Sequence, residues 1–180
     1  MSTSPLPLAW LALALAACGP AEPEAPTPSA ETSEPVLDED GLGRLGAETP
    51  FDTAAVRAAL PSGFAVEGGA TDVSGAPILW ALRDGLLILE VHRGEDGRVG
   101  RVDAVSDQVE GPDGARTGQS YADLGGRMAC DPGEGDLAGR AVCRRGAIRY
   151  VFAHGGAPDA VPDDDELEAA LLERMVWMAD

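Results

Sequence analysis

PILWALRDGLLILEVHRGEDGRVGRVDAV, residues 77–105, is the stretch that decides the fold. Two apolar runs in it meet at Asp84-Gly85. An Asp-Gly pair between such runs favours a two-residue hairpin turn, because both turn positions need positive φ. A second turn at 94–97 leads into residues 98–105. The stretch therefore predicts three consecutive antiparallel strands, a meander.

Beyond the meander, the chain predicts further strands and two helices. Residues 63–66 predict a short strand before it, and 139–145 with 147–154 predict a second hairpin after it. Residues 117–124 predict a short middle helix, which two glycines end. A run of acids followed by Leu and Met at helical spacing predicts a C-terminal helix over 163–178, because a helix start favours negative charge.

An N-terminal helix is predicted from Asp52 to Leu60. The Asp52 carboxylate can accept hydrogen bonds from the free amides of the first turn, and Phe51 with Val56 matches a hydrophobic staple. Pro61 ends the helix. The predicted fold class is therefore α+β, with an antiparallel sheet of roughly six strands, a meander plus a hairpin. An N-terminal helix, a short middle helix and a C-terminal helix complete it, the last covering the sheet.

The N-terminus resembles the signal of a bacterial lipoprotein. The tetrapeptide LAAC at 15–18 closes an apolar run that begins near Leu6, and it resembles a lipobox. The resemblance implies that residues 1–17 are a removed signal peptide and that Cys18 carries a diacylglycerol and an acyl chain such as palmitate. An ordinary secretory signal peptide is the alternative, and the first residues lack the usual Lys or Arg. A transmembrane helix would need a longer apolar run.

Residues 18–40 predict a lipidated cysteine followed by an extended acidic tether. The range 19–40 has many acids, no base and frequent prolines. Such a segment buries too little apolar surface to fold, and proline with charge repulsion keeps it extended. A single domain is expected over 41–180. Gly19 stands where an Asp is associated with inner-membrane retention, so the resemblance favours the outer membrane, facing the periplasm.

The charge of the chain restricts its partners. The 180 residues include 31 acids and 13 bases, and the net charge is −18. Such a charge opposes a phosphate backbone, so nucleic acid is not an expected partner. It also repels anionic lipid headgroups, so the membrane would be held through the lipid anchor on Cys18. A cationic protein is an open alternative as partner, with solubility as the simpler interpretation of the charge.

The cysteine count agrees with the lipobox. If Cys18 carries lipid, Cys130 and Cys143 remain as a pair for an oxidising compartment. Closing a loop of this size stabilises a fold by about 3 kcal/mol. A metal site is the alternative, but it needs further ligands, and neither CxxC nor a Cys/His cluster is present. The sequence therefore predicts a disulfide, with no metal and no cofactor.

Catalytic patterns are not evident in the sequence. It contains no HExxH, GxSxG or phosphate-loop motif. Glu90 and His92 lie on the same side of a predicted strand and form a candidate acid/base pair, but the preferred interpretation is a pair of solvated surface residues. His154 lies at another strand end, and Ser120 has no evident base. The chain is therefore not expected to be an enzyme, and no catalytic residue is assigned.

Two acidic segments are candidates for calcium binding, and neither fits. The loop at 131–136, which holds Asp131, Glu134 and Asp136, is rich in Gly, but its spacing departs from that of a calcium loop. The acid run at 163–166 is interpreted as complementing a helix dipole. No metal is therefore expected in either segment.

Several stretches together form a family pattern. They are the lipobox, GLGRLGAETPFDTAAVRAALP at 41–61, ILEV at 88–91, GPDGARTGQSYADL at 111–124, and two cysteines before IRYVF at 148–152. Together they resemble the RpoE-regulated lipoprotein family, bacterial lipoproteins whose domain has no assigned function. The resemblance implies an envelope lipoprotein with an α+β domain, linked to envelope stress, and no active residues to carry over. The expected function is a non-enzymatic structural or binding module for envelope maintenance, and the alternative is an inhibitor or binder of cationic proteins such as lysozyme.

Overall fold

The computed structural model describes residues 34–71, 75–154, 160 and 162–179. The expected signal peptide, the lipidation site Cys18 and most of the expected tether lie outside the described residues. Within the described residues, no helix is long and apolar enough to cross a bilayer.

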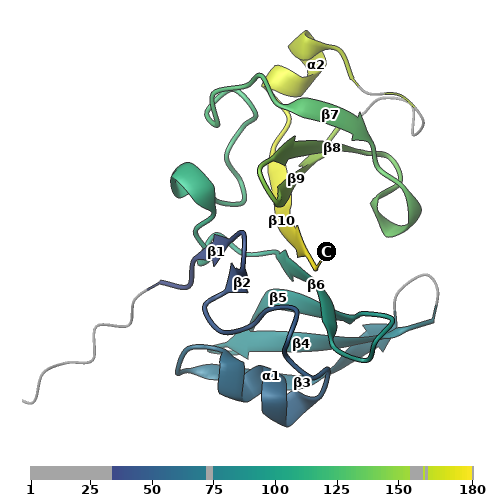
Figure 1. Cartoon of the computed structure of the whole chain (residues 1–180). Coiled ribbons are helices and arrows are strands. Elements are labelled where there is room, and N and C mark those ends of the chain that lie inside the picture. Colours follow the sequence, from purple (N-terminus) through teal and green to yellow (C-terminus); the bar gives the residue numbers. More distant parts are fainter. Residues whose placement is uncertain (1–33, 72–74, 155–159, 161, 180) are drawn as a thin grey trace, which may run out of the picture. The chain divides into compact units, whose positions relative to one another are not determined.

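Eight strands of the described chain form one antiparallel sheet (Figure 1). Its strands lie in the order β3-β4-β5-β6-β10-β9-β8-β7, so the last strand of the chain lies in the middle and β3 and β7 form the edges. The strands are β3 (Phe64–Thr71), β4 (Pro77–Arg83), β5 (Leu86–Arg93), β6 (Val99–Ala104), β7 (Ala129–Pro132), β8 (Arg140–Arg145), β9 (Ile148–Ala153) and β10 (Leu172–Met178).

Strands β4, β5 and β6 occupy the stretch in which a meander was expected. The turn between β4 and β5 has φ 52° at Asp84 and 78° at Gly85, both positive as this turn type requires. The second predicted hairpin is present as β8 and β9, which pair through six residues on each strand. Local turn chemistry therefore predicts these connections correctly.

The α+β class is wrong, because the described chain is mostly β, with eight strands in the large sheet. The predicted C-terminal helix is limited to α2 (Asp164–Glu168), and β10 takes its place from Leu172 onward. Strand β10 pairs with β6 on one side and β9 on the other, and Met175, Val176 and Trp177 are all buried. A short apolar run buried on both faces has no strict alternation, so its spacing also fits a helix.

The predicted middle helix at 117–124 is also wrong, because this segment forms turns. Its backbone bonds to the segment around the start of β10: the Gly118 amide donates to Leu172 and the Tyr121 amide to Ala170. Amides and carbonyls used in this way are not available for a helix. Two short 3₁₀ turns, η1 (Pro112–Gly114) and η2 (Gly135–Leu137), lie elsewhere in the chain.

The predicted N-terminal helix is present as α1 (Thr53–Ala59). The Asp52 carboxylate accepts from the amides of Ala54 and Ala55, as its capping role requires. A small two-stranded sheet, β1 (Leu37–Asp38) and β2 (Gly41–Leu42), precedes the helix. Leu37 is fully buried and its amide donates to Glu110, so the packed structure includes residues before Gly41.

The two faces of the sheet differ in character. The core face carries most of the large buried side chains, such as Leu89, Tyr150 and Phe152, and it packs with residues of β1, β2, α1 and the segment after β6. Tyr121 from that segment meets Phe152 edge to face, with ring centroids 5.3 Å apart. The opposite face carries charged side chains and is called the polar face below. Alternation along each strand assigns residues to one face or the other.

Candidate ligand pocket on the polar face

A row of directly paired residues crosses the polar face from β5 to β8. Glu90 lies opposite Asp103, Asp103 opposite Val176, Val176 opposite Arg149, and Arg149 opposite Arg144. Residues that are directly opposite in an antiparallel sheet point to the same side. The pairing register therefore brings charged residues from four strands onto one surface, with Val176 of β10 between them.

Asp103 lies at the centre of an ion-pair network on this face. Its carboxylate has no exposed surface, and the Nε and Nη2 atoms of Arg101 each lie 2.5 Å from one of its oxygens. Arg174 Nη1 lies 3.0 Å from Asp103 Oδ2 and 3.3 Å from Glu90 Oε2. A buried carboxylate requires such partners, because an unpaired charge away from water is strongly destabilising.

His92 borders this network and is buried. Its Nε2 lies 3.9 Å from Asp103 Oδ2, too far for a hydrogen bond, and no other described group bonds to that atom. Burial lowers the pKa of His92 below its ordinary value, although the charge of Asp103 acts in the opposite direction. The interpretation of Glu90 and His92 as solvated surface residues is wrong, because the fold places His92 beside a buried carboxylate.

Glu90, His92 and Asp103 are close enough to hold a metal ion, with one ligand atom from each within 4.8 Å of the others. Two guanidinium groups, however, already contact these oxygens: Arg101 bonds to both oxygens of Asp103, and Arg174 bridges Asp103 and Glu90. A cation placed there would displace Arg174 and meet the positive charge of Arg101. The donor set therefore fits a closed ion-pair network better than a metal centre.

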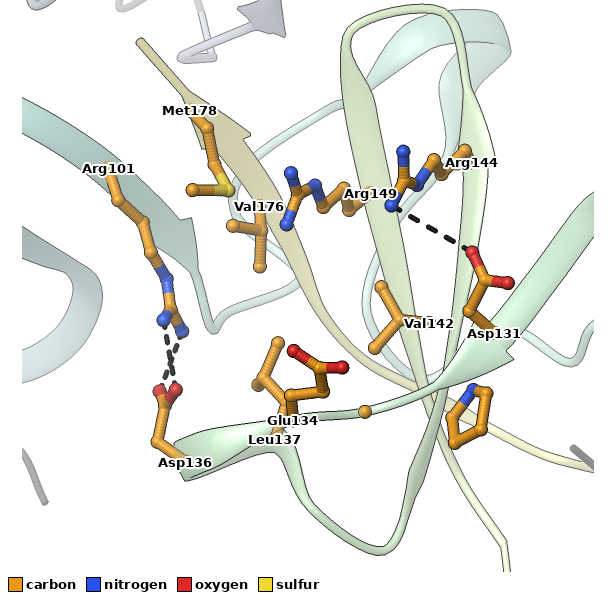
Figure 2. A pocket seen from close by; sticks show the side chains of 12 residues that line it. Arg101, Asp131, Glu134, Asp136, Leu137, Val142, Arg144, Arg149, Val176 and Met178 are labelled. Carbon is orange, nitrogen blue, oxygen red and sulfur yellow. Dashed lines mark hydrogen bonds and ion pairs between the residues drawn. The ribbon is translucent and has the colours of Figure 1, made fainter. Parts of the chain in front are cut away.

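A pocket of about 530 Å³ adjoins the network (Figure 2). It lies between the segment that joins β7 to β8 and the polar face of the sheet. Arg101 forms one side, where its guanidinium lies 2.8 Å from Asp136. Burial by itself would raise the pKa of Asp136, but hydrogen bonds and charge from Arg101 lower it overall. The lining consists of Arg101, Asp131, Pro132, Gly133, Glu134, Asp136, Leu137, Val142, Arg144, Arg149, Val176 and Met178.

A tight loop between β7 and β8 forms the pocket wall that faces the sheet. The Gly133 amide donates to Arg140, and an added Cβ at Gly133 would lie 2.0 Å from the Leu137 carbonyl oxygen, so only glycine fits. Leu137 then packs with Val142, Val151 and Val176 in a second apolar cluster on the polar face. This packing keeps the acidic loop close to the sheet.

The predicted disulfide between Cys130 and Cys143 is present, and it joins residues directly opposite each other in β7 and β8. Because β7 is a four-residue edge strand, the covalent bond holds the start of the loop beside the sheet. The disulfide therefore supports the pocket as well as the edge of the fold.

The acidic residues of the loop at 131–136 line the pocket at separate places, and two of them pair with different arginines. Asp131 lies 3.8 Å from Arg144, and Asp136 pairs with Arg101. Glu134 extends into the pocket between them (Figure 2). Carboxylates separated by arginines do not form a calcium loop. The loop therefore forms a charged wall of the pocket.

The described residues that line the pocket include no Ser, Thr, Cys, His, Lys or Tyr. His92 is not among them, and Arg101 lies opposite it in β6. The Ser120 hydroxyl donates to Asp123 on an exposed turn, away from this lining. His154 follows β9 and does not line the pocket. The pocket therefore provides charged groups, carboxylates among them, and apolar contact, and its described lining has no hydroxyl, thiol or imidazole side chain.

Sequence reasoning missed the arginines that dominate the site. Arg144 and Arg149 are placed side by side by the β8–β9 register, and Arg174 lies on a strand that was predicted to be helical. A usable signal was the alternation around Arg149, which is flanked by Ile148 and Tyr150 on the core face. An arginine between two core residues must point to the other side of a strand.

The fold and the pocket together define a mainly antiparallel β protein with a charged pocket on the polar face of its sheet. Residues 29–179 match the family described as "Protein of unknown function (DUF1131)". The chain belongs to this family.

The chain is also similar to the "Uncharacterized protein YfeY" of Escherichia coli strain K12, with 24% identity over 149 residues. That alignment covers 78% of this chain and 78% of the relative. The crystal structure of the uncharacterized protein yfeY from Escherichia coli covers 79% of this chain and 99% of its own, with 22% identity and a TM-score of 0.64. At this identity, the structural likeness shows a common fold and no function.

Proposed function

We propose that this protein is a lipid-anchored binding module of the bacterial cell envelope, with the pocket on the polar face as its ligand site. The observation that carries the proposal is the composition of the pocket: opposite charges surround an apolar floor, and no hydroxyl, thiol or imidazole side chain is among the described residues that line it. Ligand sites are typically concave, with apolar walls and a few placed polar groups. The proposed role is binding without catalysis, and it is supported by the position of His92, which does not line the pocket.

The envelope location rests on the N-terminal lipobox and on the disulfide. The LAAC sequence ending at Cys18 supports a lipid anchor, and the resemblance to RpoE-regulated lipoproteins supports a role in envelope maintenance. A disulfide persists in oxidising compartments such as the periplasm. Gly19 favours the outer membrane. The acidic segment after Cys18 would hold the domain away from the bilayer.

A ligand panel tests the binding role directly. The full chain, in detergent, is titrated with amino acids, short peptides, sugars, inorganic phosphate and short fatty acids, while methyl NMR signals of Leu137, Val142 and Val176 are followed. At least one class should cause saturable shifts. Met178→Trp, which fills the pocket from its rim, should abolish them, whereas Leu86→Trp, at an exposed apolar residue that begins β5 and does not line the pocket, should not. If no class shifts these methyl signals, the pocket is not a ligand site.

A second candidate function is binding of cationic proteins such as lysozyme. The net charge of −18 favours it, as does the group of acids formed by Asp38, Glu39, Asp40 and Asp113 at a second hollow. In a lysozyme assay, the protein should then inhibit at micromolar concentration, with inhibition that weakens as salt rises. Full lysozyme activity in the presence of the protein would exclude this function.

A further inference from the structure

Some of the charged residues that line the pocket have an ion-pair partner, and others do not. Six charged residues line it, and four form two pairs, Arg101 with Asp136 and Arg144 with Asp131. The remaining two are Arg149 and Glu134. In the part of the chain that the structure describes, neither side chain has an ion pair or a hydrogen bond, and Figure 2 shows both extending into the pocket. The pocket thus contains one free cation and one free anion within these described residues.

Arg149 is poorly placed for stability alone. It is half-buried, and it lies directly opposite Arg144, a second cation, whose own carboxylate is 3.8 Å away. Like charges directly opposite in a sheet are destabilising, and partial burial weakens the solvation of an unpaired charge. A bound anion beside Arg149 and Arg144 would relieve both effects.

Glu134 restricts which anion fits. Its free carboxylate would repel a second negative group on the ligand and would accept a hydrogen bond from an ammonium group. The whole chain carries a charge of −18, which further opposes a multiply charged anion such as phosphate. A ligand with one negative and one positive group adds no net charge and satisfies both free residues.

Between these two residues, the pocket floor is apolar. Val142, Val176 and Leu137 form it, and Met178 lies at its rim. An aliphatic side chain of a ligand would contact this floor while its charged ends meet Arg149 and Glu134. We propose that the pocket binds a small zwitterion, an amino acid or short peptide with a free amine and a free carboxylate. This inference rests on the proposed binding function and names its ligand class.

The test uses one dipeptide in three forms. The full chain in detergent is titrated with leucyl-alanine, with N-acetyl-leucyl-alanine, which lacks the positive end, and with leucyl-alaninamide, which lacks the negative end. Isothermal titration and the methyl signals of Val142 report binding. The free dipeptide should bind saturably, and each blocked form should bind about tenfold to a hundredfold more weakly, the loss of one charge-assisted contact.

Matched variants assign each end of the ligand to a residue. Arg149→Gln should weaken binding of the free dipeptide by a similar factor. In Glu134→Gln, the preference for the free dipeptide over the N-acetylated dipeptide should shrink, because the negative charge that attracts the ammonium group is gone. Arg140→Gln, in which the lost arginine pairs with Glu173 and does not line the pocket, should bind like the parent protein. Circular dichroism of each variant verifies folding.

Different failures have different meanings. If N-acetyl-leucyl-alanine or inorganic phosphate binds as tightly as the free dipeptide, the pocket is an anion site and the proposal of a zwitterionic ligand is wrong. If other compounds of the panel shift the pocket methyl signals while all three dipeptides do not, the ligand class is wrong and the binding function stands. If nothing shifts them, both proposals are wrong.

Discussion

Arg101 and Asp103, two residues apart in β6, form a two-point ion pair in which both N···O distances are 2.5 Å and the carboxylate has no exposed surface. Side chains two residues apart on a strand lie on the same face, so this pair forms within one strand. The second contact of Arg101, with Asp136, links the network to the acidic loop. One guanidinium thereby connects the sheet to the pocket wall.

Removing the buried carboxylate should be strongly destabilising. Asp103→Ala leaves Arg101 and Arg174 without their shared partner, and breaking a buried pair in this way costs about 3–5 kcal/mol of unfolding free energy. Urea denaturation followed by circular dichroism measures the loss. Glu48→Ala is the control, because Glu48 pairs with Arg98 in solvent, and its effect should stay below about 1 kcal/mol. Equal effects of the two variants would show that burial of Asp103 contributes nothing.

His92 should make stability depend on pH. Its pKa in the folded state is lowered from the ordinary value of 6.5, chiefly by burial. Well above pH 6.5, His92 is neutral in both the folded and the unfolded state, and its full contribution to the unfolding free energy is present. As the pH falls below 6.5, the unfolded chain takes up a proton that the folded chain resists, so stability is lost.

His92→Gln removes this proton uptake. Unfolding free energies are measured from pH 8 to pH 5 for both proteins, and the difference between them cancels the common effect of the carboxylates. The parent protein should lose more stability than the variant below pH 6.5. Parallel curves would mean that His92 has the same pKa in both states.

The disulfide should contribute to stability and to the pocket. Cys130→Ala should lower the unfolding free energy by about 3 kcal/mol and leave Cys143 reactive in denaturant. The loop at 131–136 should then loosen, because edge strand β7 loses its covalent link, and methyl signals of Leu137 and Val142 should shift. Cys18→Ala, measured in the same way, should leave the denaturation midpoint unchanged. Two freely reactive thiols at 130 and 143 in the purified, unreduced protein would exclude the disulfide.

Two neighbouring glycines of β3 should respond differently to alanine. An added Cβ at Gly69 would lie 2.5 Å from Nε1 of Trp80, whereas one at Gly68 meets nothing within 4 Å. Gly69→Ala should therefore displace the indole, lower stability by about 1–3 kcal/mol and change tryptophan fluorescence. Gly68→Ala should be neutral or stabilising by up to about 1 kcal/mol, because alanine loses less entropy in a strand. An unchanged emission spectrum in Gly69→Ala would contradict the Trp80 contact.

Attachment to the membrane should depend on one thiol. Cys18→Ser should abolish incorporation of labelled palmitate and leave residues 1–17 uncleaved or cleaved elsewhere. Each buried methylene contributes about 0.8 kcal/mol, so several acyl chains on Cys18 would anchor the protein, which its acidic domain could not do alone. Cys130→Ser serves as the control and should incorporate label normally. Labelled palmitate in the Cys18 variant would exclude the lipid anchor.

Several features could be predicted because their causes are local. The Asp84-Gly85 turn needs only two residues of suitable conformation, and the Asp52 cap needs only the amides that follow it. The pairing of Cys130 with Cys143 followed from counting, once Cys18 was set aside. The three strands over 77–105 follow from alternation between recognisable turns. In each case the decisive interactions join residues close together in the chain, or leave a single choice.

The central strand and the pocket depend on contacts between distant residues. Whether 172–178 becomes helix or strand is decided by β6 and β9, where Met175 pairs with Ala104 and with Tyr150. Its apolar spacing fits both structures, so the hydrogen bonds of two neighbouring strands determine the outcome. The pairing of β10 with β9 sets Arg149 beside Val176, and that of β9 with β8 sets it opposite Arg144. The sequence alone determined the positions of the turns, of the helix cap and of the disulfide. Only the tertiary pairing of the strands decided which charged residues lie side by side, because the charge pattern of one strand has no register with another until the two are aligned.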